Sequence, residues 1–444
     1  MTARRRPKQE VWEGPTIPEA SMALCEMFPA EWVREVARET GLVKRERVVD
    51  PVAMLWVMAL SFGVGMVRRI EMLRHRYEQE TGDDLGYASF YERFTPELVR
   101  FLKACAARGM QELAKDANRV LDDKLSQFVD ILIQDSTVIR VHAALAGKWP
   151  ATRSRKKAAG VKLATRISAV ANGPTDVRIY GERTSESKTM HVGSWVKGSI
   201  ALFDLGFYKH QMFARIEENG GFFVSRLKEN SDPLLVASLR THRGQAIELA
   251  GKRWSEVRQR LKREIVDSEV ELAFPRRAYR GRRSGDTMKV RLVGVYNEEA
   301  GKYHTYLTNI QPDVLAPEEI GKLYGARWEV EMLFKEMKRV YALDGIKTKN
   351  PQVVEALIWT GILTLIMSRK VHNMVRRAAP PEVRPRLTQL RWAGYFLGNA
   401  HRFLPVVLEK YGIEDSETLR LRIHTSQALD PHLNRRRFTD GVWG

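Results

Sequence analysis

The sequence contains very little cysteine. Its 444 residues include two cysteines, Cys25 and Cys105, which lie far apart and belong to no Cys/His cluster. This excludes a disulfide framework and a Cys/His zinc site, and it fits a reducing cytoplasm. The basic N-terminal residues are not followed by an apolar signal stretch.

Long hydrophobic runs are also missing. The two longest, residues 52–67 and 356–368, are shorter than the about 18 apolar residues that a membrane-spanning helix needs. Both contain Gly, Ser or Thr. We interpret them as buried helices and expect no membrane partner. A Gly-rich phosphate-binding loop ending in Gly-Lys-Ser/Thr is absent too, which argues against a nucleotide-hydrolysing helper protein.

Acidic residues are in the minority. Lys and Arg number 73 against 54 for Asp and Glu, so the formal net charge is +19 and the pI about 9.9. A chain this basic favours a polyanionic partner, and nucleic acid is the commonest one. The alternative for charge alone is a solvated basic surface.

The sequence pattern predicts four parts. Residues 1–17 resemble a disordered basic arm, and residues 18–125 have apolar side chains at helical spacing, with Pro51 and Pro96 near helix starts. A role in DNA binding fits this helical domain. Residues 126–370 alternate strands and helices, which indicates an α/β domain, with a β-rich segment at about 230–312. Residues 371–444 are predicted to form a helical region and a polar tail.

Two predicted strands each end in an acid. Asp135 closes the β-branched run 128–135, and Asp204 closes the run 199–204. Strand ends of α/β sheets hold reactive groups rigidly beside open loops. Paired carboxylates there suit Mg²⁺, which takes oxygen ligands. The alternative is that both are turn residues, since Asp favours turns.

A third acid lies on a predicted helix at residues 324–338. At about 100° per residue, Tyr324, Arg327, Glu331 and Lys338 share an arc of about 60°, with Lys335 beside it. Glu329 and Glu336 fall well off this face. A stripe of one acid among cations and a phenol suits a metal and phosphate site, although surface ion pairs would give the same pattern.

These residues resemble a known family. The segment from Tyr324 to Lys338 matches the Tyr-x2-Arg-x3-Glu-x6-Lys signature of DDE transposases of bacterial insertion sequences, in the branch called insertion-sequence family 4. Asp135-Ser136-Thr137 resembles the family's first-acid motif. The second-acid motif, Asp followed by Gly and an aromatic, is matched at residues 204–207. The order and spacing of the motifs also agree, over about residues 128–370.

The resemblance implies a ribonuclease-H-like α/β core interrupted by a β-strand insertion, between helical N- and C-terminal regions. It implies that Asp135, Asp204 and Glu331 hold Mg²⁺, for which Mn²⁺ substitutes, and catalyse hydrolysis, hairpin formation and strand transfer. Double-stranded DNA, as terminal inverted repeats and target, is the implied partner, bound by a homodimer in the bacterial nucleoid.

Further residues are expected to touch DNA. Family members stack a flipped base on an aromatic of the insertion; a tryptophan is missing at the expected place, so Tyr303 is our first choice and Tyr306 the second, with ordinary strand packing as the alternative. The predicted phosphate contacts are Tyr324, Arg327, Lys338, Lys335, Arg153, Arg155, Lys156, Lys157, Lys162 and the insertion arginines from Arg276 to Arg283.

Two other function classes stay open at this point. A nuclease or resolvase of the same core fold would cut DNA without joining it. A decayed transposase would bind DNA without catalysis.

Overall fold

The computed structural model describes residues 12–44, 49–62, 70–116, 119–121, 123–152, 158–242, 245–259, 261, 264–276 and 284–413. The predicted basic arm up to residue 11, the insertion residues 277–283 and the tail from residue 414 lie outside them. The chain forms two compact units: the first consists of residues 1–109 and 337–444, and the second of residues 110–336. These units divide the chain at other places than the predicted domains, because the second unit ends before residue 370.

The first unit is helical. It contains α1 (Ile17–Met27), α2 (Ala30–Glu39), α3 (Pro51–Ser61), α4 (Ile70–Thr81), α5 (Tyr87–Tyr91), most of α6 (Pro96–Lys115), α12 (Pro351–Ala378), α13 (Gln389–Asn399) and α14 (Phe403–Glu409). The predicted helix starts at Pro51 and Pro96 are confirmed. Asp50 caps α3 by accepting hydrogen bonds from the N–H groups of Val52 and Ala53.

Helix α12 is long and apolar enough to cross a membrane by length and composition. Most of that apolar stretch is buried inside the protein, and α12 packs against α1, α3 and α13. The described part of the run 52–67 is also buried, within α3. Both runs are therefore core helices of the first unit, as the sequence predicted.

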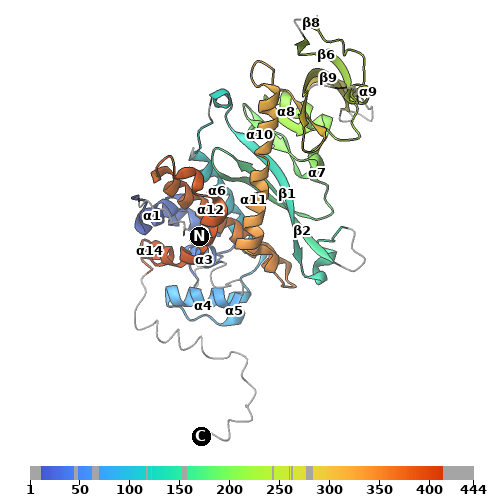
Figure 1. Cartoon of the computed structure of the whole chain (residues 1–444). Helices are drawn as coiled ribbons and strands as arrows, with labels where there is room; N and C mark the ends of the chain where they lie inside the picture. The colour runs from blue at the N-terminus through green and yellow to red at the C-terminus, as the bar shows by residue number, and fades with distance from the viewer. Residues whose placement is uncertain are drawn as a thin grey trace, which may run out of the picture. The chain divides into compact units, whose positions relative to one another are not determined.

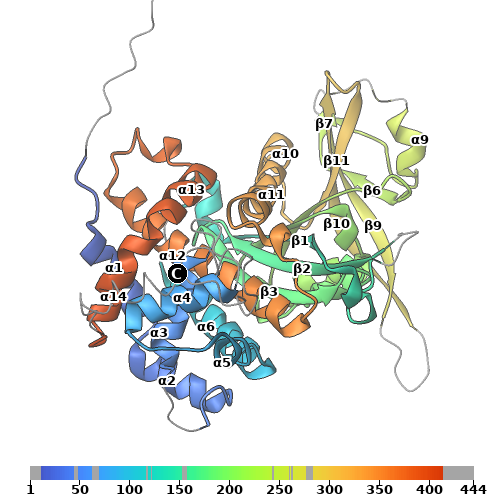
Figure 2. The same ribbon diagram turned by 90° about the horizontal axis from the view of Figure 1, so that it is seen from below.

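A nine-stranded sheet forms the centre of the second unit (Figures 1 and 2), in the order β3-β2-β1-β4-β5-β11-β10-β9-β6. Its first five strands are β1 (Ile131–Val141), β2 (Ala159–Ser168), β3 (Gly173–Gly181), β4 (Ile200–Phe203) and β5 (Phe222–Arg226). The strands β1, β2 and β3 run antiparallel, whereas β4 pairs parallel with both β1 and β5. The predicted strands in these places are confirmed.

The β-rich segment does not form a sheet of its own. Its strands β6 (Leu234–Ser238), β9 (Ile265–Pro275), β10 (Gly285–Asn297) and β11 (Lys302–Thr308) continue the same sheet, because β11 pairs antiparallel with β5. A two-residue pair, β7 (Thr241–His242) and β8 (Gln245–Ala246), stands apart. The predicted hairpin between β10 and β11 is confirmed, whereas the sequence prediction missed β6 and β9.

Apolar packing holds the short helices against this sheet. In α8 (His210–Glu218) the ring of Phe213 stacks on Phe223 of β5 at 4.6 Å and lies 5.8 Å from Phe203 of β4. These rings belong to a buried cluster that continues to Trp254 of α9 (Trp254–Arg258) in the insertion. One core thus supports both the first five strands and the inserted ones.

The predicted single helix at residues 324–338 is wrong in detail. It consists of α10 (Pro317–Gly325), a turn, α11 (Trp328–Lys335) and a π-helical segment at Glu336–Val340. Helix α10 packs on β5, β9, β10 and β11, whereas α11 packs on β1 and β2. The π-helical turn contains more residues per turn than an α-helix, so a single helical wheel does not place Lys338.

Candidate active site

Asp135 lies within a strand, which corrects the prediction that it ends one. Strand β1 continues to Val141 along β2, but its parallel partner β4 stops at Phe203, opposite Gln134. Asp204 follows Phe203 directly. The two acids are therefore the next residues of neighbouring parallel strands, and they point to the same side of the sheet.

Arg327 connects two of the three predicted acids. Its guanidinium donates to Glu331 Oε1 at 2.7 Å and lies 3.5 Å from Asp135 Oδ2. The side chains of Arg327 and Asp135 are 13% and 14% exposed, and that of Glu331 is 29% exposed, so solvent screens these charges only partly. The packing of α11 on β1 thus brings Glu331 to the side of the sheet where Asp135 lies.

The other two acids of this region point elsewhere. Glu329 accepts hydrogen bonds from Arg119 at 2.8 Å, and Glu336 is fully buried. Both were expected off the stripe on the helical wheel. The geometry leaves Glu331 as the acid of α11 that faces Arg327.

The first acid is held in an environment that disfavours its charge. Burial, with smaller contributions from the charges of Asp204 and Glu186, raises the pKa of the Asp135 carboxyl to about 6. The N–H of Ser136 and the charge of Arg327 act in the opposite direction. A divalent cation would relieve such a cluster, because hard carboxylate oxygens are the ligands that Mg²⁺ takes.

The acids do not enclose a metal site as they stand. Among the residues that the structure describes, no three His, Cys, Asp or Glu side chains are grouped so that they could hold a metal ion. The cation that now lies between Asp135 and Glu331 is the Arg327 guanidinium. The donor chemistry fits a divalent metal, because carboxylate oxygens are the ligands that such a cation takes.

Tyr324 contacts the backbone at the end of β4. It is buried, its hydroxyl donates to the carbonyl oxygen of Phe203 at 3.3 Å, and burial raises its pKa to about 12. This hydroxyl anchors the last residue of β4, directly before Asp204. Tyr324 therefore supports the strand end in this structure, rather than reaching out toward phosphate.

The two lysines that were predicted on or beside the stripe lie in different helical segments. Lys335 is exposed on α11, with its ammonium 5.9 Å from the ring centre of Trp328. Lys338 lies in the π-helical segment, beyond the boundary of the second unit. Trp328, which the sequence reasoning passed over, is 57% exposed and adjoins Arg327. Its position as an aromatic residue beside the polar stripe is the sequence signal by which it could have been found.

Only some of the predicted basic DNA contacts lie within the described residues. Arg153, Arg155, Lys156 and Lys157 lie outside the described residues. Lys162 is buried, and its ammonium donates to the carbonyl oxygen of Thr184 at 2.6 Å, so it is not displayed to phosphate. Of the insertion arginines, Arg276 is described and pairs with Glu218 and Asp286.

The two candidate aromatics have different surroundings. Tyr306 is buried, with its ring 5.3 Å from that of Tyr324. Tyr303 lines an open pocket of about 410 Å³ in the insertion. The pocket combines aromatic and cationic side chains, which include Tyr296, Trp254, Arg226, Lys228, Arg258 and Lys302.

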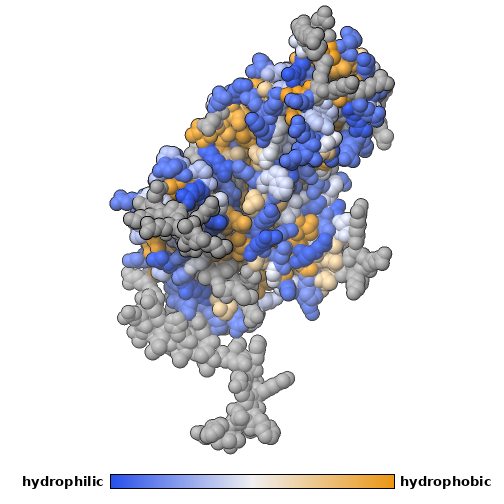
Figure 3. Space-filling model, viewed as in Figure 1, coloured by the Kyte–Doolittle hydropathy of each residue, from blue (hydrophilic) through white to orange (hydrophobic). Residues whose placement is uncertain are grey.

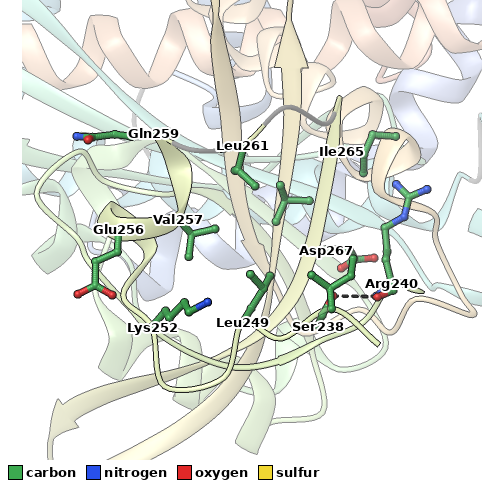
Figure 4. A pocket seen from close by; sticks show the side chains of 12 residues that line it. Ser238, Arg240, Leu249, Lys252, Glu256, Val257, Gln259, Leu261, Ile265 and Asp267 are labelled. Atoms are coloured by element: carbon green, nitrogen blue, oxygen red, sulfur yellow. Dashed lines mark hydrogen bonds between the residues drawn. The ribbon is translucent and has the colours of Figure 1, made fainter. Parts of the chain in front are cut away.

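A second pocket of about 710 Å³ lies between β9 and the segment around α9 (Figure 4). Its lining includes Asp267, which pairs with Arg291, and the exposed Lys252 and Glu256. None of the predicted catalytic residues lines it.

The family model described as "Transposase DDE domain" matches residues 127–367, which is more than half of the chain. The chain belongs to the DDE transposase family. This family catalyses DNA cleavage and strand transfer, so the protein is a DNA transposase. The matched span contains Asp135, Asp204 and Glu331.

Curated relatives cover most of the transposase. It is 22% identical over 399 residues to the transposase for insertion sequence element IS231F of Bacillus thuringiensis subsp. israelensis, covering 82% of each chain. It is 16% identical over 378 residues to the transposase for insertion sequence element IS1151 of Clostridium perfringens, covering 79% of this chain and 80% of the relative.

Among solved structures, the transposase is similar to the piggyBac transposase in a cryo-EM structure of its synaptic complex with hairpin DNA. The sequence identity is 12% and the TM-score 0.46, with 97% of this chain and 91% of the other covered.

Proposed function

We propose that this transposase moves an insertion sequence by cut-and-paste, as a member of insertion-sequence family 4. The observation that carries the proposal is that Asp135 and Asp204 occupy neighbouring positions of adjacent parallel strands, with Arg327 between Asp135 and Glu331, inside the span of the family match. The curated relatives, which are transposases for insertion sequence elements, support it.

The proposed core is ribonuclease-H-like. Three antiparallel strands followed by two parallel ones, in the order β3-β2-β1-β4-β5, support this assignment. The inserted strands extend the sheet beyond β5, and after them the chain continues through α10 to α11. In the proposed core the insertion therefore positions α11, and with it Glu331, relative to the strands of the two Asp residues.

Asp135, Asp204 and Glu331 are proposed to hold Mg²⁺, or Mn²⁺ in its place. When bound, the metal activates the attacking oxygen and stabilises the leaving oxygen at phosphorus. The protein's own residues set the geometry: Tyr324 fixes the end of β4, and Arg327 holds Asp135 and Glu331 together. The planar guanidinium of Arg327 would also suit bidentate contact with a DNA phosphate.

Further residues are proposed to contact DNA. Lys335 and Lys338 would bind phosphate, and the exposed Trp328 offers a ring for stacking against a base. For a base flipped during hairpin formation we propose Tyr303, because its pocket brings aromatic rings together with cations. We leave Lys162 out of the proposed contacts because its ammonium is buried. Arg155, Lys156 and Lys157 stay proposed contacts on sequence grounds.

Cleavage of a labelled duplex that carries the element's own terminal repeat tests the proposal. We expect nicking and a hairpin product with Mg²⁺ or Mn²⁺, loss of both with EDTA, and loss of both in Glu331→Ala. Glu329→Gln, two residues away on α11, is the matched control and should cleave normally. Cleavage without joining in a strand-transfer assay would indicate a nuclease, and tight binding without any cleavage a decayed transposase.

A further inference from the structure

Glu186 lies between the two Asp motifs, although it belongs to neither. It begins the short helix α7 (Glu186–Thr189), which follows β3 and packs against the turn after Asp204. The hydroxyl of Ser136 donates to Glu186 Oε1 at 2.9 Å. Ser136 also uses its N–H to bind Asp135 Oδ1 at 2.7 Å. One carboxylate oxygen of Glu186 therefore binds the first-acid motif through the hydroxyl of Ser136.

The other carboxylate oxygen lies over the second-acid motif. A Cβ atom added to Gly206 would lie 2.6 Å from Glu186 Cδ and would overlap Oε2. Gly206 has no positive φ that would by itself require glycine. Glycine at the second position after Asp204 thus leaves the space that the Glu186 carboxylate occupies.

The chain that leads to Glu186 is fixed to the sheet. The buried ammonium of Lys162 donates to the carbonyl oxygen of Thr184, and the N–H of Glu182 donates to Gly160 at 3.0 Å. Arg140 of β1 forms an ion pair with Glu182. The position of Glu186 is therefore set by β1 and β2, the strands that carry and flank Asp135.

We propose that Glu186 is a positioning residue of the active site, which holds Asp135 and Asp204 at their working separation through Ser136 and Gly206. The inference rests on the proposed function, since it concerns how the two acids meet metal. Glu186 acts here by shape and hydrogen bonding, so glutamine at this position keeps its role and alanine does not.

The test combines metal dependence with a double-mutant cycle. We expect Glu186→Ala to raise the Mn²⁺ concentration for half-maximal nicking by about tenfold or more, as loss of such supporting contacts does in metal sites. Calorimetry on the DNA-free protein should show the same loss of Mn²⁺ affinity. Glu186→Gln should stay near wild type, and Lys188→Ala, on the exposed side of α7, is the matched control.

Gly206→Ala completes the cycle. Alone it should reproduce the defect of Glu186→Ala, because its methyl group displaces the carboxylate. In the Glu186→Ala protein, Gly206→Ala should add little to the metal-binding defect, because its methyl group no longer overlaps a carboxylate. Additive defects, or a Glu186→Ala protein that loses thermal stability while its metal dependence is unchanged, would overturn the inference. Wild-type protein that neither binds Mn²⁺ nor cleaves end DNA would overturn the proposed function as well.

Discussion

At the scale of single residues, one guanidinium faces acids from different parts of the fold. Arg327 contacts Asp135 of β1 and Glu331 of α11, and it also feels the charge of Asp204 after β4. Each acid is on a separate element, so small movements of α11 change their separations. We infer that Arg327 keeps the acids together in the absence of metal.

Arg327→Gln should therefore change the response of the protein to metal. Without Arg327 the acids repel one another, and we expect a lower melting temperature in EDTA than for wild type. Added Mn²⁺ should raise the melting temperature of the variant more than that of wild type, because binding then relieves a larger repulsion. Thermal melts with and without Mn²⁺ measure this, and equal shifts in the two proteins would contradict it.

Asp204→Asn tests the second acid by itself. The amide has nearly the same shape, but it lacks the charge that attracts metal. We expect binding of the terminal repeat to be kept, and strand cleavage to fall by about a thousandfold, since metal stabilisation is worth several kcal/mol. Gel-shift and cleavage assays on one protein preparation measure both. Normal cleavage would show that Asp204 is not a ligand.

At the scale of elements, a buried ion pair connects the inserted strands to the start of α10, the helix that precedes α11 and its Glu331. Arg291 of β10 and Asp267 of β9 form two hydrogen bonds of 2.7 Å, and both side chains are 3% exposed. Arg291 also donates to the carbonyl oxygen of Leu315 at 2.7 Å, just before α10. The pair thus fixes the start of α10 on the inserted strands.

Arg291→Met should destabilise the protein by about 3–5 kcal/mol, because it leaves Asp267 buried without its partner. Lys289→Met is the matched control on the same strand: its pair with Glu269 is half-exposed and is worth less than about 1 kcal/mol. Urea unfolding followed by tryptophan fluorescence compares the two. Equal stabilities would mean that the buried pair does not hold the insertion.

At the scale of the whole molecule, positive charge dominates. The net charge of +19 accompanies a surface that is mostly hydrophilic over the face seen in Figure 3. DNA binding by such a protein releases counterions from the phosphates. Affinity for the terminal repeat should fall by about a thousandfold or more between 50 and 200 mM salt, if about six or more phosphates are contacted. A flat salt dependence in a filter-binding titration would favour a merely solvated basic surface.

Assembly belongs to this scale as well. We propose that two copies pair on two transposon ends. Size-exclusion chromatography with light scattering should show two chains per complex once the terminal-repeat duplex is added. A complex that contains one chain and one duplex would contradict this arrangement.

The sequence by itself determined the chemistry. The apolar runs before Asp135 and Asp204, and the helical stripe with Glu331, are patterns of residues close together in the sequence. The hairpin between β10 and β11 was also predictable, since its turn residues join two clear strands. The β9 run was missed because charged residues interrupt it, and its pairing with β10 and β6 shows it to be a strand.

Tertiary structure decided the rest. Asp135 proved to lie within a strand, because β1 continues along β2 where β4 has stopped. The side chains of Tyr324 and Lys162 turned inward to backbone carbonyls, which no spacing in the sequence reveals. Glu186 belongs to none of the sequence motifs. Its place between Ser136 and Gly206 depends on contacts between segments far apart in the chain, and such contacts exist only once the sheet has formed.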